Sequence, residues 1–300
     1  MFISEKLTIP IFLRLGKAEE IQAIYENSEF IFSCPANWLD YGLKNRNLSF
    51  GDYHECAFAC VTNADPDHCI ENARKRYLGN LIEGTSTEMT YLYKHPNLLR
   101  PTTCFYHLSM KEFDLFLNKA QRQRGIECAN LSQDVSHGSV SLNVNATKLS
   151  QVFDLQSEKA AFLIIRNISA FFDDLRQGII DTFQYPKNIE HIIEIENGFD
   201  TSSVDLLFNK MPVTYYPSNM PFFYDDNLES FKKSDNYSSQ REFRIQIARC
   251  YFLQKYSQEG YDFQKNLLRI PLKHIKKYAD VFTPPMCLQE IKANFEFAET

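Results

Sequence analysis

A carboxylate and an amide stand two residues apart in the segment YSSQREFRIQI. Because side chains alternate along a strand, Gln240 and Glu242 are predicted on one side of the chain, with Arg241 on the other. A carboxylate held there can stabilise positive charge that develops on a substrate. Arg14, in IFLRL, has a planar guanidinium suited to phosphate, and Ser33 ends the strand-like segment FIFSCP. These groups act together only if the fold brings them into one cleft.

The order Arg14, Ser33 and Gln-x-Glu resembles the R–S–E arrangement of the ADP-ribosyltransferases. Tyr237, just before it, resembles the aromatic residue of their substrate-recognition turn. The segments FLRLGKAEEIQAIYENSEFIFSCPANWLD and FKKSDNYSSQREFRIQI also resemble the ends of an uncharacterised prokaryotic family associated with phage defence. This chain departs from the ADP-ribosyltransferase pattern at Ser-Cys-Pro, where S-T-S is usual, and at Arg244, where apolar residues often follow.

The resemblance implies that NAD is the substrate and that the reaction cleaves its nicotinamide–ribose bond. Glu242 would stabilise the oxocarbenium character of the ribose. Arg14 would hold the NAD diphosphate or adenylate ribose, and Ser33 would steady the strand beside the nicotinamide ribose. Both Arg14 and Ser33 are therefore expected to be catalytic and cofactor-binding residues.

Further residues near these segments suit the remaining parts of such a site. Trp38 and Tyr41 are expected to bind NAD, because either ring can stack on a flat base. Gln240 and Tyr237 are expected to bind the acceptor, which is a macromolecule of unidentified class. The resulting hypothesis is a toxin or antiphage effector that ADP-ribosylates a protein or nucleic acid, or hydrolyses NAD, with a regulatory protein as a further partner.

Two other functions remain open. A metal-dependent nuclease would use carboxylates such as Asp173 and Asp174 with the Glu242-x-Arg244 strand, although Lys is usual in place of that arginine. We expect Asp173 and Asp174 to lie on a solvated helix face instead. A non-catalytic sensor of a defence system would dock through the aromatic segment TYYPSNMPFFY. A zinc site around Cys56 and Cys60 is less favoured than buried thiols, because both cysteines fall on one apolar strand.

The elements that must position these residues alternate irregularly between strands and helices. This pattern predicts an α+β fold with a split, mixed or antiparallel sheet flanked by helices, which is also the core that the resemblance to ADP-ribosyltransferases implies. We expect a single elaborated domain over residues 1–300, with a long aromatic and polar loop at about 198–240. Strands are expected at 9–15, 29–34, 56–62, 88–94, 102–108, 139–144, 160–166 and 241–248, and helices at 17–27 and 168–183, with a further helix capped by Ser109.

Composition limits the remaining classes of protein. Apolar residues make up 44% of the 300-residue chain, enough to bury a core, and the net charge of −6 argues against a broad electrostatic grip on nucleic acid. No run of about 18 apolar residues and no signal-peptide pattern is present, so we expect no membrane association. The eight cysteines lie in apolar contexts, which favours reduced thiols and a cytoplasmic protein.

Overall fold

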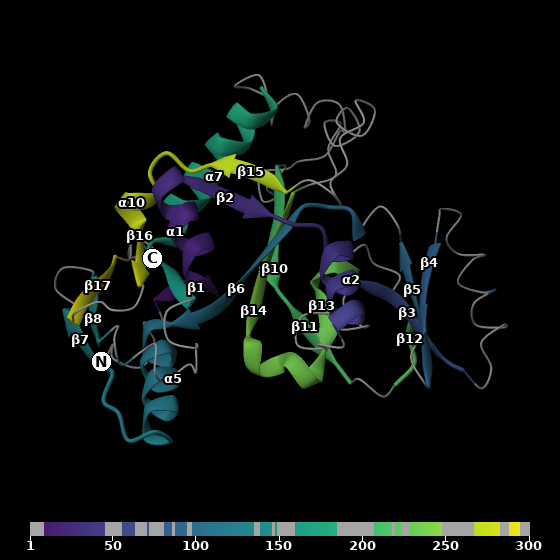
Figure 1. Cartoon of the computed structure of the whole chain (residues 1–300), viewed down its shortest axis with the longest axis horizontal. Helices are drawn as coiled ribbons and strands as arrows, with labels where there is room; N and C mark the ends of the chain where they lie inside the picture. Colours follow the sequence, from purple (N-terminus) through teal and green to yellow (C-terminus); the bar gives the residue numbers. More distant parts are fainter. Residues whose placement is uncertain are drawn as a thin grey trace, which may run out of the picture. The chain divides into compact units, whose positions relative to one another are not determined.

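The computed structural model describes residues 9–45, 56–63, 71, 81–85, 88–94, 98–134, 139–145, 148, 160–184, 207–217, 220–223, 228–247, 267–282 and 288–294. The chain divides into two compact units, each built from separated segments. Unit 1 comprises Met1–Phe30, Phe105–Pro186 and Ile270–Thr300, and unit 2 comprises Ile31–Cys104 and Lys187–Arg269. Figure 1 labels their elements.

Unit 1 is built on an antiparallel sheet in which the end of β6 is followed by β1, β9 and β16. A second antiparallel sheet of this unit has the order β17-β8-β7. The strands are β1 (Pro10–Lys17), β6 (Thr102–Ser109), β7 (Ala129–Asp134), β8 (Ser139–Asn145), β9 (Ala160–Ile165), β16 (Ala279–Phe282) and β17 (Leu288–Asn294). The helices are α1 (Ala18–Asn27), α5 (Met110–Arg122), α7 (Ile168–Phe183) and α10 (Ile275–Tyr278).

Alternation along β1 explains how this sheet buries both faces. Ile11 and Leu13 point into a core shared with α5 and the β17-β8-β7 sheet. Phe12, on the opposite face, stacks on Phe105 with ring centroids 4.9 Å apart and meets Phe171 of α7 edge-on at 6.2 Å. A strand with two apolar faces is expected in a sheet covered on both sides.

The helices of unit 1 begin and pack as their sequences predict. Ser109 caps α5 in a reciprocal capping box: its Oγ accepts from the Glu112 N–H at 3.1 Å, and its own N–H donates to Glu112 Oε2 at 3.0 Å. Helix α7 needs a glycine, because a Cβ on Gly178 would lie 2.1 Å from the Pro271 carbonyl oxygen. Pro271 ends β15 (Leu268–Pro271), which pairs with β2 (Glu29–Phe32).

Unit 2 contains the antiparallel sheet β12-β3-β5-β4 and the antiparallel pair β10 and β14, with the start of β6 beside β14. The short strands β11 and β13 pair in parallel. Its elements are α2 (Pro35–Asn45), β3 (Ala57–Thr62), β4 (Leu81–Thr85), β5 (Met89–Lys94), β10 (Phe208–Pro212), β11 (Thr214–Tyr216), β12 (Phe222–Phe223), η3 (Glu229–Phe231), β13 (Lys232–Ser234), η4 (Asp235–Gln240) and β14 (Glu242–Ile247).

The α+β class and the antiparallel sheets agree with the expectation from sequence, and the parallel pair β11 and β13 makes the set mixed. Two local predictions were incomplete. Residues 35–45 form a helix that the sequence did not predict, and Pro35 stands at its first position, where its missing N–H costs no hydrogen bond. The described part of the expected loop at 198–240 contains strands β10 to β13, which Pro212 and Pro217 keep short.

Candidate functional site

One face of β14 is polar and buried. Glu242, Arg244 and Gln246 alternate along this strand and are 7%, 0% and 1% exposed. Ile245 and Ile247 on the other face are apolar core residues. Burying polar side chains is unfavourable unless each finds hydrogen-bond partners. The partners of these three side chains therefore show how the fold compensates for their burial. All of these residues belong to unit 2.

The Glu242 carboxylate has a different cation on each oxygen. Its Oε1 accepts from Arg244 Nε at 2.7 Å, and its Oε2 accepts from Lys233 Nζ at 3.2 Å. The thiol of Cys104 is a further donor to the carboxylate. Arg244 is in turn fixed by donating from Nη1 to the Ser230 carbonyl oxygen at 2.6 Å. These charge-assisted bonds join β13, β14 and η3 into one network.

This network keeps Glu242 ionised. Burial alone would raise the pKa of this carboxyl, but the charge of Arg244, then that of Lys233, and the hydrogen bonds outweigh it and lower the pKa from 4.5 to about 2. The carboxylate is therefore a fixed negative charge at any physiological pH. A fixed negative charge is what stabilisation of a cationic transition state requires.

Gln240 and Glu242 lie on one side of the chain, as alternation predicts, although Gln240 ends η4 and only Glu242 belongs to the strand. Both side chains accept from the same ammonium: Lys233 Nζ lies 3.0 Å from Gln240 Oε1. Arg241 between them is exposed and has φ 44°, in the left-handed region. Tyr237 packs its ring on Lys233, with Nζ 4.8 Å from the centroid.

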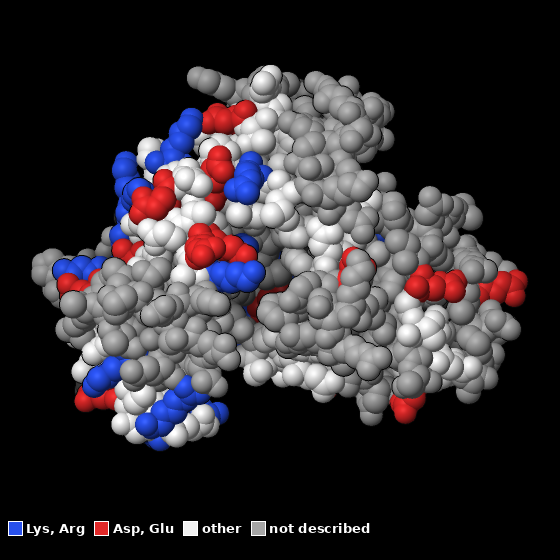
Figure 2. All heavy atoms as spheres, viewed as in Figure 1, with Lys and Arg blue, Asp and Glu red and all other residues white. Residues whose placement is uncertain are grey.

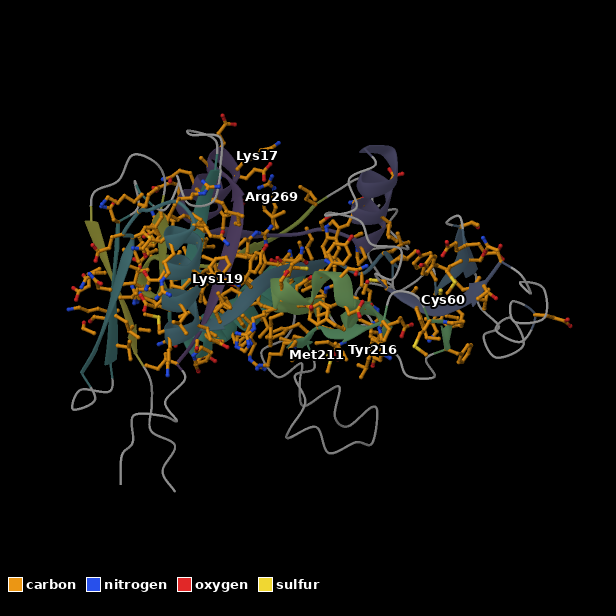
Figure 3. All side chains as sticks on the ribbon, turned by 90° about the horizontal axis from the view of Figure 1, so that it is seen from below. Lys17, Cys60, Lys119, Met211, Tyr216 and Arg269 are labelled. Carbon is orange, nitrogen blue, oxygen red and sulfur yellow. The ribbon has the colours of Figure 1, made fainter. Side chains whose placement is uncertain are left out.

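Tyr215 fixes the first residue of β14. Its Oη accepts from the Glu242 backbone N–H at 2.8 Å, and it stands opposite Lys233 in the parallel pair β11 and β13. Burial is the main cause that raises the pKa of Tyr215, so the phenol stays neutral. On the next residue, Tyr216, Lys232 Nζ lies 5.8 Å from the ring centroid. Met211 and Tyr216, labelled in Figure 3, mark β10 and β11 in this part of unit 2.

Trp38 of α2 contacts the network through Arg244. The Arg244 guanidinium carbon lies 5.7 Å from its ring centroid, a cation–π distance. Ser33 lies two hydrogen bonds away from β14: its backbone exchanges both hydrogen bonds with Thr102, and the Thr102 hydroxyl accepts from Gln246 Nε2 at 3.3 Å. Tyr41 belongs to α2, but its side chain lies outside the described part of the structure.

Arg14 is placed in unit 1, whereas the other predicted site residues that are described belong to unit 2. Its guanidinium carbon lies 4.9 Å from the Phe30 ring centroid, beside the aromatic core of unit 1. The structure thus groups Glu242, Gln240 and Tyr237 around one lysine of unit 2, and Arg14 belongs to unit 1.

Other sequence candidates have structural roles. Asp174 was expected on a solvated helix face, but it is 6% exposed and its Oδ2 accepts from Tyr278 Oη and the His274 N–H, both at 2.8 Å. This expectation was wrong, because this turn of α7 faces α10. Asp173 is exposed, as expected. Among the described residues, no group of three His, Cys, Asp or Glu side chains is placed to hold a metal ion.

The described thiols agree with the expectation of buried cysteines. Cys34, Cys56, Cys60 and Cys128 are buried and form no disulfide with another described cysteine, and burial raises the pKa of Cys60 to about 12. Cys104 is partly exposed. Within the described part of the chain, no helix has the length and apolarity needed to span a bilayer.

Charges on the described surface are mixed in sign, as Figure 2 shows for one face. Two lysines of the basic run at 273–277 are paired: Lys273 Nζ lies 2.6 Å from Asp181 Oδ2, and Lys276 Nζ lies 2.9 Å from Glu26 Oε2. Comparison with protein-family models, with curated proteins and with solved structures finds no significant match. The site therefore has to be interpreted from its own chemistry.

Sequence reasoning missed Lys233 and placed Arg244 only in the nuclease alternative or as an ion-pair partner of Glu242. A signal for both was present: the spacing of Lys233, Gln240, Glu242 and Arg244 places three charged residues within twelve positions of a segment otherwise typical of a loop and a strand. Arg244 also shares the face of Glu242 by strict alternation. Opposite charges two residues apart on one strand face, such as Glu242 and Arg244, predict an ion pair. The contact of Lys233, which belongs to another strand, depends on the tertiary structure and could not be predicted from spacing.

Proposed function

We propose that this protein cleaves the nicotinamide–ribose bond of NAD, and that Glu242 is its catalytic carboxylate. The single observation that supports the proposal best is the permanently ionised Glu242, held between Arg244 and Lys233 and adjoining the half-buried Gln240. Each carboxylate oxygen has two lone-pair directions, so each can accept from a ribose hydroxyl in addition to its present donor. The α+β fold with mixed sheets is compatible with this chemistry and does not require it.

The reaction balances as a glycosyl transfer. The bond between ribose C1′ and the nicotinamide nitrogen breaks, and its electron pair leaves with neutral nicotinamide. A nucleophile then bonds to C1′ and releases its proton to solvent. Glu242 stabilises the positive charge of the ribose between these events, as an ionised carboxylate does in glycoside cleavage. The nucleophile is a group on a macromolecule in a transferase, or water in an NAD hydrolase.

The remaining site residues take supporting roles in this proposal. Gln240 and Tyr237 orient the acceptor, Trp38 and Tyr41 offer flat rings to NAD, Ser33 steadies the strand next to the ribose, and Arg14 binds the diphosphate or adenylate ribose. An effector of this kind would act in the cytoplasm as a toxin or an antiphage defence protein, with a regulatory protein partner.

The test is nicotinamide release from labelled NAD, with and without a cell lysate as the source of acceptors. Wild type is expected to release nicotinamide, and Glu242→Gln is expected to lose at least 100-fold in rate, the range reported for removal of a transition-state electrostatic contact. Labelled macromolecules would identify a transferase, and free ADP-ribose an NAD hydrolase.

Glu229→Gln is the matched control. Glu229 is a second buried carboxylate of unit 2, 0% exposed and 3.0 Å from Lys94 Nζ. Its replacement removes a buried charge of the same kind at a place with no proposed role, so the rate per folded molecule should stay near that of wild type. Absence of NAD binding and of nicotinamide release in wild type would refute the proposal, as would equal loss of rate in both variants.

A further inference from the structure

The ammonium of Lys233 is the point at which the polar side chains of this site meet. Lys233 is only 6% exposed, and a buried lysine is retained only where its charge and its three donors are used. Its Nζ donates to Gln240 Oε1 at 3.0 Å and to Glu242 Oε2 at 3.2 Å, and it lies 4.8 Å from the centre of the Tyr237 ring. Two expected acceptor-binding residues and the expected catalytic carboxylate therefore share one nitrogen.

The two cations on Glu242 differ in their surroundings. Arg244 is fully buried and is anchored to the Ser230 carbonyl oxygen, so it holds Oε1 from the interior. Lys233 holds Oε2 and also contacts Gln240 and Tyr237, both of which are partly exposed. The Oε2 side of the carboxylate is thus the side next to accessible groups.

The chain between these partners contains a strained residue. Arg241 has φ 44°, a conformation that residues with a Cβ adopt at a cost, and it separates the end of η4 from the start of β14. Lys233 reaches across this residue and bonds to the side chains on both sides of it. Removal of this ammonium would release Gln240 from Glu242 at the one junction where the backbone is strained.

We infer that Lys233 is the positioning residue of this site: it orients Glu242 Oε2 toward the substrate and fixes Gln240 beside it, without itself contacting the reacting atoms. The inference rests on the proposed function for its reaction, but the placement of the carboxylate can be measured without NAD. The titratable and charged groups that face Glu242 are Arg244 on its own strand, Lys233 on β13, Tyr215 on β11 and Cys104 on β6.

The experiment follows the titration of Glu242 by carbon NMR of its labelled carboxyl group, in wild type, Lys233→Met and Lys233→Arg. Removal of one of two adjacent cations should raise the pKa of Glu242 by about 1 to 3, and Lys233→Arg should restore it. Lys94→Met, which removes a lysine from the Glu229 pair in the same unit, is the control and should leave the Glu242 signal unchanged. Glu242→Gln assigns the signal.

The same variants are then assayed for nicotinamide release against pH. The acid limb of the rate should move to higher pH in Lys233→Met, following the Glu242 titration, and return in Lys233→Arg; a purely structural lysine would lower the rate equally at all pH values. If Lys233→Met does not fold, Lys233→Gln keeps an N–H donor without the charge, and its titration decides the point.

The outcomes separate the two claims. An unchanged Glu242 titration in folded Lys233→Met or Lys233→Gln overturns the inference, even if wild type consumes NAD. A raised titration with no nicotinamide release from wild type refutes the proposed function alone and leaves Lys233 as the residue that sets the carboxylate. A raised titration with a shifted acid limb supports both.

Discussion

The strands β1 and β14 show two ways in which this protein buries a strand. In unit 1, Phe12 of β1 is 1% exposed and is surrounded by the rings of Phe105, Phe171 and Phe172 at centroid distances of 4.9 to 6.2 Å. In unit 2, the corresponding interior face of β14 carries Glu242, Arg244 and Gln246. Both strands bury these side chains, but only β1 gains stability chiefly from apolar area.

The difference lies in how each interior responds to change. Packed rings need no particular hydrogen-bond or charge partner, so the loss of one ring leaves no unpaired polar group among the others. Buried charges depend on particular partners, and the loss of one leaves the other desolvated and unpaired. A buried network of this kind contributes little net stability when complete, which favours a chemical reason for its presence in unit 2.

Replacement of Arg244 should have the largest effect on stability. Arg244→Met leaves Glu242 buried with Lys233 as its remaining cation, and the free energy of unfolding should fall by about 3–5 kcal/mol, the usual cost of breaking a buried ion pair. Urea unfolding measures the loss. Adding Glu242→Gln to Arg244→Met should recover part of it, whereas no second change should rescue Phe12→Ala. If the effects of paired substitutions added equally in unit 1 and unit 2, the two interiors would not differ in their response to change.

The second difference concerns pH. Because the folded pKa of Glu242, about 2, lies below the unfolded value of 4.5, its ionisation stabilises the fold fully above about pH 4.5, and this contribution is lost as the pH falls toward 2. The stability difference between wild type and Glu242→Gln should therefore be constant near neutral pH and shrink between pH 4.5 and 2. The difference between wild type and Phe12→Leu should not vary with pH. Unfolding curves at several pH values test both.

A third change tests whether the tight packing of unit 1 tolerates added volume. Gly178→Ala would normally favour a helix, but here the new methyl would meet the Pro271 carbonyl oxygen and Ile270 Cγ2, so we expect a loss of about 1–3 kcal/mol. Asp173→Ala, at an exposed position of the same helix, should change stability by less than about 0.5 kcal/mol. A stabilised Gly178→Ala would show that α7 can move away from β15 at little cost.

The smallest expected effect is local to α5. Ser109→Ala removes the cap that accepts from the Glu112 N–H and should cost about 1 kcal/mol. Ser109→Asp keeps an acceptor at the cap and should retain most of the stability. Neither change should alter the Glu242 titration, because the capping box and the charged network belong to different units. Thermal unfolding together with the NMR titration checks this independence.

Sequence patterns predicted those parts of the fold that depend on local order. Short apolar segments located β1, β6, β9 and β14, and the Ser109–Glu112 spacing located the start of α5. Helix α2 was missed because its sequence, PANWLDYGLKN, mixes turn-forming residues with its apolar positions. Its proline lies in the first turn, where proline favours the start of a helix, whereas in the interior it would interrupt one.

In the site, too, contacts between residues close in sequence could be predicted, and contacts between separate strands could not. The shared side of Gln240 and Glu242 was predictable, and so was their proximity to Tyr237, which is at most five residues away along the chain. That Lys233 unites them follows from the parallel pairing of β11 and β13, which no spacing in the sequence specifies. Arg14 was selected by its residue type and its place in the Arg–Ser–Glu order. It belongs to unit 1, where its guanidinium carbon lies 4.9 Å from the Phe30 ring centroid, and its role in binding NAD stays a prediction.

The division of the chain also determines the order in which the units can be completed during synthesis. Unit 1 starts within residues 1–30, yet β9, which pairs with β1, is made only after residue 159, and β16 only after residue 278. At a translation rate of about 5–20 residues per second, β1 waits roughly 7 to 30 s for β9. During that interval Ile11, Phe12 and Leu13 have no complete sheet to cover them. These residues are therefore a candidate client for chaperones that hold apolar segments on the ribosome, while unit 2 needs nothing beyond residue 269.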